Sequence, residues 1–146
     1  MYKTDQNTVN KNEWEISQAV DHVAYYLDNK DMNELMKHFS VDAHLEIIEG
    51  DKLVCDLNGQ QAIRDVLAKR LEESDDVFHL TGTKMIKVNV PDQNATANTC
   101  CVARLVRRDP DAATTQFIEY NDRLIKVDGF WYIVERTIHI ISQSIA

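Results

Sequence analysis

The chain has 146 residues, of which 44% are hydrophobic and 27% charged, and its net charge is −8. This hydrophobic content can build a packed core and excludes an intrinsically disordered chain. The length suits one domain that spans residues 1–146. Because nucleic acids and anionic membranes attract basic surfaces, the acidic balance argues against both as partners.

The sequence also lacks the usual membrane and export signals. No apolar run approaches the ~18 residues of a transmembrane helix, and the polar first twelve residues lack the apolar block of a signal peptide. We therefore expect a soluble cytoplasmic protein in which residues 1–11 form a loose leader. The adjacent Cys100 and Cys101 would point to opposite faces of a strand, so we expect the three cysteines to be buried structural thiols rather than a disulfide or metal clip.

Apolar residues at helical spacing predict three helices in the first half of the chain. The first runs from residue 12 or 13 to residue 27 or 28. A short second helix, residues 32–38, follows Asp31, which forms a capping-box pattern with Glu34. Asn58 is the expected N-cap of a third helix, whose Leu67 side faces the core and whose Arg70 belongs to the charged opposite side.

Alternation of apolar and polar residues predicts six strands. Two short strands, residues 44–49 and 52–56, precede the third helix. Four long strands follow it, at residues 79–90, 95–107, 114–127 and 130–142. The Asp-Gly pair at residues 128–129 favours a tight primed turn, so the last two strands should form a hairpin.

The separation of helices from strands predicts an α+β fold. Strands of this length must twist, so we expect a strongly curved antiparallel sheet packed around three helices, as a cone-shaped α+β barrel. A sheet wrapped around helices leaves a cavity between them, which is the default place for a small-molecule site.

Two residues are candidates for acid–base chemistry. His79 opens the first long strand, and histidine titrates near neutral pH, so it is either a half-buried structural residue or a general base. Asp28 ends the first helix, where the helix dipole disfavours a carboxylate. It is either solvated or paired, and a histidine partner would form a dyad that fixes the imidazole tautomer.

Arg136 is unusual because it aligns with large apolar side chains on the last strand, and a buried guanidinium needs a partner. It forms either an ion pair with Asp122 or Glu119 across the hairpin, or a cation that binds substrate oxygen in the cavity. Tyr120 and Tyr132 are either core aromatics or proton donors to a ligand.

Four stretches together resemble the SnoaL-like (polyketide cyclase/dehydratase-type) branch of the nuclear-transport-factor-2-like superfamily. They are LDNKDMNELMKHFSVDAHLEI, NGQQAIRDVL, FHLTGT and EYNDRLIKVDGFWYIVER. The resemblance covers residues 12–142. Its order is an aspartate that ends the first helix, a histidine that opens the first long strand, and a Y-x-D…D-G-x-W…R ending.

This resemblance implies a cofactor-independent lyase or isomerase, dehydratase- or cyclase-like, that acts on a small, largely apolar cyclic substrate. His79 and Asp28 would be the catalytic dyad, and Arg136, Tyr120, Tyr26 and Tyr132 would contact the substrate. Some dehydratases of the family carry a tyrosine five residues before the aspartate. Here that residue is Val23, which argues against tyrosine-assisted dehydration. The sequence holds no nucleotide-binding loop or cysteine–histidine ligand cluster, so we expect no cofactor and no metal.

The family also contains non-catalytic members, so the alternative is a ligand-binding or assembly module like the small subunit of ring-hydroxylating dioxygenases. In either case the outer sheet face needs a cover, and the resemblance implies self-association as a dimer or trimer. The plausible contributors to that contact are Val102, Val106, Phe117 and Ile141.

Overall fold

The computed structural model describes residues 5–109 and 111–145, and it has the predicted α+β architecture of three helices and six strands. The helices are α1 (Gln6–Asp28), α2 (Met32–Met36) and α3 (Gln60–Glu72). The strands are β1 (Phe39–Glu49), β2 (Lys52–Asn58), β3 (Asp76–Asn89), β4 (Asn94–Arg108), β5 (Asp111–Val127) and β6 (Phe130–Ile145).

All six strands belong to one sheet, in the order β2-β1-β6-β5-β4-β3. The four long strands pair antiparallel, as predicted, but β1 pairs parallel with β6. The prediction of a purely antiparallel sheet is therefore wrong at this junction. The parallel pair is possible because the chain leaves the sheet through α3, re-enters at the opposite edge and returns to β1 only with its last strand.

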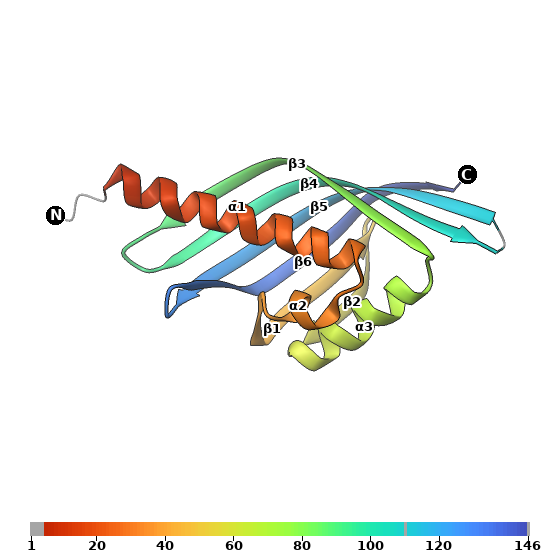
Figure 1. The fold of residues 1–146 in the computed structure, drawn as a ribbon, viewed down its shortest axis with the longest axis horizontal. Helices are drawn as coiled ribbons and strands as arrows, with labels where there is room; N and C mark the ends of the chain where they lie inside the picture. The colour runs from red at the N-terminus through yellow and green to blue at the C-terminus, as the bar shows by residue number, and fades with distance from the viewer. Residues whose placement is uncertain (1–4, 110, 146) are drawn as a thin grey trace.

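The helices cover one face of this sheet. In Figure 1, α1 crosses the long strands while α2 and α3 lie near β1 and β2. Buried residues of α1 recur at helical spacing, as expected for a helix with one apolar stripe: Ile16, Val20, Val23 and Leu27. This stripe joins the side chains of the inner sheet face in one hydrophobic core. None of the helices in the described ranges has the length and apolar character needed to cross a bilayer.

Helix α1 begins earlier than the sequence pattern indicates. Residues 6–11 are helical, so the predicted loose leader is wrong there, and residues 1–4 lie outside the described ranges. Asp5 caps the helix by accepting a hydrogen bond from the backbone N–H of Asn7. Buried Asn12 holds the first turns to the sheet, because its Oδ1 accepts hydrogen bonds from Lys126 Nζ and Trp131 Nε1. This polar segment carries no apolar stripe that could have revealed its helical state.

The start of α3 also differs from the prediction. Its N-cap is Gly59, while Asn58 is the last residue of β2. Gly59 has a φ of 93°, a conformation that side chains rarely adopt, and its N–H donates to the carbonyl of Ala43 at 2.8 Å. Of the three cysteines, all free, only Cys101 is buried; Cys100 is exposed, which contradicts the prediction for that residue.

The predicted hairpin between β5 and β6 forms, and both Asp128 and Gly129 have positive φ as a type I′ turn requires. A β-bulge interrupts it, because Leu124 pairs with Ile133 while Arg123 pairs with Glu135. Val134 is thus the extra residue, and beyond it the strand presents the opposite set of side chains. The simple alternation predicted for residues 130–140 is therefore wrong after residue 133.

The bulge turns Arg136 into the core, directly opposite Asp122 on β5. Both residues are 4% exposed, and they form a bidentate ion pair with distances of 2.7 Å from Nε to Oδ1 and 3.1 Å from Nη2 to Oδ2. Burial disfavours the charged guanidinium, but Asp122 outweighs this effect and raises the pKa of Arg136. The ion-pair interpretation of Arg136 is thus the one that matches the structure.

Asp122→Asn should destabilise the fold by about 3–5 kcal/mol, because it leaves a buried guanidinium without its counter-charge. Chemical denaturation measures this loss. Glu135→Gln is the matched control, since it makes the same change in the exposed Arg123–Glu135 pair of the same two strands and should cost less than about 1 kcal/mol. The double variant Asp122→Leu/Arg136→Met should recover most of the stability. Equal losses in the two single variants would contradict the importance of burial.

Candidate active site

The structure brings the two acid–base candidates together. Asp28 is the last residue of α1, and His79 lies near the start of β3, where the helix end crosses the strand. Asp28 Oδ1 is 2.7 Å from His79 Nδ1. The side chain of His79 is 8% exposed and that of Asp28 is 22% exposed. The dyad geometry predicted from the sequence is therefore present, whereas its catalytic role stays a prediction.

The contact fixes the chemistry of the imidazole. A carboxylate can only accept a hydrogen bond, so His79 Nδ1 carries a hydrogen and donates the bond that Asp28 Oδ1 accepts. Nε2 makes no hydrogen bond to any residue that the structure describes, and in the neutral ring it holds a free lone pair. A proton taken up at Nε2 would create an imidazolium that Asp28 stabilises at once.

This dyad is the last contact of a polar seam between α1 and β3. Asp21 accepts a hydrogen bond from Thr81 Oγ1 at 3.0 Å and forms an ion pair of 2.5 Å with Lys84. A seam of this kind can have a purely structural role, namely to hold the helix on the edge strand. Unlike Lys84, His79 also lines an apolar cavity.

The cavity lies between the helices and the inner face of the sheet and has a volume of about 100 Å³. Most of its lining is aliphatic, from Leu27, Ile47, Leu67, Leu71, Leu105, Ile118, Ile138 and Ile140; the polar lining residues are Arg70, His79, Gln116 and Tyr120. An empty cavity of ~150 Å³ accommodates benzene. This cavity is smaller, so it suits a small molecule, and a ring of benzene size or larger requires its leucines to move.

Tyr120 is the predicted substrate-contacting residue that does line the cavity. It is 4% exposed, and burial raises the pKa of its phenol well above the usual range. The phenol therefore stays protonated and can donate a hydrogen bond to a ligand oxygen. The Arg136 guanidinium lies over the Tyr120 ring, 4.2 Å from its centre, and Arg136 is not among the residues that line the cavity. Arg136 thus positions a wall of the cavity without lining it.

The other two predicted contact residues lie elsewhere. Tyr26 packs beside the rings of His22 and His38, and Tyr132 packs against Phe130 with ring centres 4.8 Å apart. Neither lines the His79 cavity. The β-bulge explains why Tyr132 lies away from the cavity. Without the bulge, Tyr132 would share a strand face with Arg136, but the extra residue Val134 places the two side chains on opposite faces.

Comparison with known proteins assigns the chain to a family. A profile of the SnoaL-like domain matches residues 11–137. The chain belongs to the SnoaL-like family. A search of curated protein sequences found no match.

Solved structures share the SnoaL-like fold with this chain. A protein provisionally assigned as a scytalone dehydratase, from Novosphingobium aromaticivorans, is 18% identical with a TM-score of 0.83, over 96% of this chain and 91% of that chain. A type 2 hexachlorocyclohexane dehydrochlorinase is 12% identical with a TM-score of 0.84, over 97% and 93%. The beta subunit of a protein provisionally assigned as an aromatic-ring-hydroxylating dioxygenase, also from N. aromaticivorans, is 16% identical with a TM-score of 0.78, over 92% of each chain. At these identities the likeness establishes the fold.

The sequence interpretation missed two polar residues of the SnoaL-like cavity, Arg70 and Gln116. Arg70 was expected on the charged outer side of the third helix. It lies three residues after Leu67, and residues at this spacing share a helix side, so the signal was present in the sequence. Gln116 carries no comparable signal, because it occupies an ordinary position of a long strand.

A second histidine environment lies outside the cavity. His38 is 8% exposed among the rings of His22, Tyr26 and Phe130, and its Nδ1 is buried without a hydrogen-bond partner in the described ranges. Burial, followed by the neighbouring His22, lowers the pKa of His38 to about 4. This histidine is therefore neutral at physiological pH.

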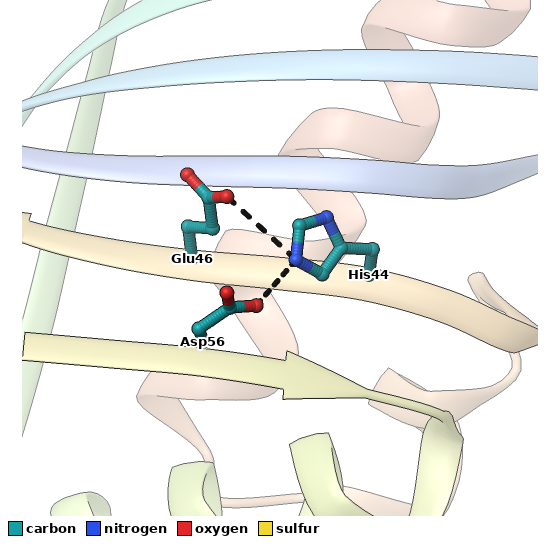
Figure 2. Close-up of side chains that lie close together, drawn as sticks. All are labelled: His44, Glu46 and Asp56. Carbon is teal, nitrogen blue, oxygen red and sulfur yellow. Dashed lines mark hydrogen bonds and ion pairs between the residues drawn. The ribbon is translucent and has the colours of Figure 1, made fainter. Parts of the chain in front are cut away.

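A third group has the side-chain types of a metal site, which the sequence interpretation did not foresee. His44 Nε2 is 2.5 Å from Asp56 Oδ1 and 3.7 Å from Glu46 Oε1. Figure 2 shows both carboxylates directed at the same ring nitrogen of His44. These three side chains could bind a divalent cation. They project from β1 and β2 on the face opposite to buried Leu45, so they are separate from the cavity. The hydrogen bond with Asp56 raises the pKa of His44, which favours an ordinary ion pair.

His38 should make the fold less stable in mild acid. Its folded-state pKa lies below the usual value of 6.5, so the unfolded chain takes up a proton first as the pH falls from about 6.5 to about 4. The loss is at most about 3 kcal/mol across this window. Chemical denaturation of wild type and His38→Leu between these pH values measures the free energy of unfolding. The part of its pH dependence that comes from His38 should be absent in the variant.

The exposed neighbour His22 provides the matched control, since burial is the main cause of the low pKa of His38 and His22→Leu should therefore keep most of the wild-type slope. If His38→Leu followed the wild-type pH dependence, then His38 would not be the group responsible.

Proposed function

We propose that this SnoaL-like protein is a cofactor-independent lyase or isomerase in which His79 removes a proton from carbon. The observation that carries the proposal is the 2.7 Å contact between Asp28 and a His79 ring that lines an otherwise aliphatic cavity. In a site of low polarity, a charge that develops in the reaction is stabilised by few groups, so each fixed group has a large effect.

Each residue has a defined part in the proposed reaction. His79 Nε2 accepts a proton from a carbon next to a carbonyl, and the electron pair of the C–H bond moves towards the carbonyl. Asp28 stabilises the imidazolium, and the Tyr120 phenol donates a hydrogen bond to the enolate oxygen. In an elimination a leaving group then departs from the neighbouring carbon. In an isomerisation the proton returns from His79 to another carbon.

His79→Ala should leave the fold intact and lower proton abstraction by about 10²–10⁴-fold, the usual contribution of a positioned base. Exchange of substrate C–H for deuterium in D₂O, followed by NMR, detects this step without knowledge of the product. The screen would contain small cyclic ketones and short polyketide fragments, which need the least rearrangement of the cavity. Asp28→Asn should also lower the exchange, because the amide cannot stabilise an imidazolium.

The polar seam supplies the control for these variants. Lys84→Met removes a seam contact outside the cavity, so it tests whether loss of helix attachment alone abolishes exchange. We expect Lys84→Met to retain activity. Normal exchange in His79→Ala would remove this residue from the mechanism.

A second candidate function is that of an assembly module, and an exposed apolar row favours it. Leu80, Val102 and Phe117 lie side by side on the outer face of β3, β4 and β5. Leu80 is 60% exposed and Phe117 is 51% exposed, whereas soluble monomers rarely expose contiguous apolar patches without a function. Self-association as a dimer or trimer would cover this row.

Phe117→Lys should convert such an oligomer into monomers, because it places a charge within the proposed contact. Sedimentation equilibrium measures the mass of each species. Val41→Lys is the control, since Val41 is 80% exposed on β1, away from the row. A wild-type protein that stays monomeric at all concentrations tested would exclude this candidate.

A further inference from the structure

We propose that the ligand of the His79 cavity is a small carboxylic acid and that Arg70 binds its carboxylate. The inference rests on the proposed function, because it takes the His79 cavity as the substrate site. Its starting observation is a charge imbalance: Arg70 supplies a full positive charge to the lining, and none of the lining residues is a carboxylate.

Within the described ranges, Arg70 has no carboxylate partner. It takes part in none of the ion pairs within 4.0 Å there, and the hydrogen bond that its guanidinium makes goes to the Cys55 sulfur, with Nη2 to Sγ at 3.8 Å. A thiol is a weak acceptor, so most of the five N–H groups of Arg70 remain available. The contact nevertheless orients the side chain between α3 and β2, next to the cavity.

The position of Arg70 in the last turn of α3 does not by itself explain why a cation occurs at this residue. Basic residues stabilise the last turn of a helix, and Arg70 lies in the last turn of α3. Lys69 lies in the same turn, is exposed and can provide that effect alone. Only Arg70 lines the cavity. The two adjacent cations therefore separate a general helix effect from a specific binding role.

The chemistry of guanidinium then selects the ligand. Arginine binds carboxylates through two parallel hydrogen bonds, and such charge-assisted bonds are strongest where water is scarce. The other cation near the cavity, Arg136, is already neutralised by Asp122. Gln116 also lines the cavity; its amide donates one hydrogen bond to Gln143 at 3.1 Å, which leaves its second N–H for a ligand. The ligand that satisfies this lining has one anionic end and an apolar body.

This assignment narrows the substrate class. A carboxylate makes a neighbouring C–H bond only weakly acidic, so the acid should also carry a ketone whose oxygen can accept the hydrogen bond of Tyr120. Arg70 is half-buried, which places the carboxylate towards solvent and the apolar part of the molecule beside His79. The structure thus points to small keto acids, in which His79 takes the proton beside the ketone.

A matched pair of probes tests the inference: 4-oxopentanoate, and 5-methylhexan-2-one, which has an isopropyl group in place of the carboxylate. NMR titration gives the affinity of each probe for wild type, Arg70→Gln, Arg70→Lys and Lys69→Gln. We expect wild type to prefer the keto acid. Arg70→Gln should weaken keto-acid binding by about 10–100-fold and leave ketone binding unchanged. Arg70→Lys should recover part of the loss, and Lys69→Gln should behave as wild type.

Three results would overturn the inference: equal binding of both probes to wild type, no binding of either at millimolar concentration, or equal losses in Arg70→Gln and Lys69→Gln. Deuterium exchange of the bound probes distinguishes a failure of the Arg70 anion site from a failure of the proposed enzyme function. Arg70-dependent binding without exchange keeps the anion site and removes the enzyme. Exchange that requires His79 but ignores Arg70 keeps the enzyme and removes the anion site.

Discussion

The buried ion pair between Arg136 and Asp122 is the interaction on which the rest of the site depends. It joins the two central long strands, and it occurs because the bulge at Val134 turns Arg136 inward. The guanidinium then packs on the ring of Tyr120, which forms one wall of the cavity. A buried pair of this kind contributes little net stability compared with apolar packing, but it tolerates few alternative arrangements. Its main effect here is therefore to fix the position of one wall of the cavity.

The same pair determines which charges remain for a ligand. Because Asp122 neutralises Arg136, the positive charge that reaches the cavity comes from Arg70 on α3. The carboxylate nearest the site, Asp28, is engaged with His79. A cavity whose lining carries a guanidinium, and whose nearest carboxylate is already engaged by a histidine, favours anionic over cationic ligands. Specificity and catalysis would thus reside on different elements, the first on a helix and the second on the junction between α1 and β3.

Local patterns in the sequence predicted what depends on local periodicity. The three helices, the long strands and the Asp128–Gly129 turn follow from residue spacing and turn chemistry, and the position of Asp28 at a helix end indicated that it needed a partner. The departures have non-local causes. The first turns of α1 depend on contacts with Lys126 and Trp131 more than a hundred residues away. The parallel pairing of β1 with β6 and the bulge at Val134 are likewise decided by strand partners that spacing cannot specify.

The two candidate functions use opposite faces of the same strand and need not exclude each other. On β3, His79 points to the cavity while its neighbours Phe78 and Leu80 are more than half exposed on the outer face. Because side chains alternate along a strand, the proposed catalytic residue His79 and the proposed contact residue Leu80 are neighbours in sequence but lie on opposite faces. An assembly contact on the outer face would also hold β3, an edge strand, in place. Since His79 belongs to that edge, self-association would steady the dyad, and the assembly would support catalysis rather than replace it.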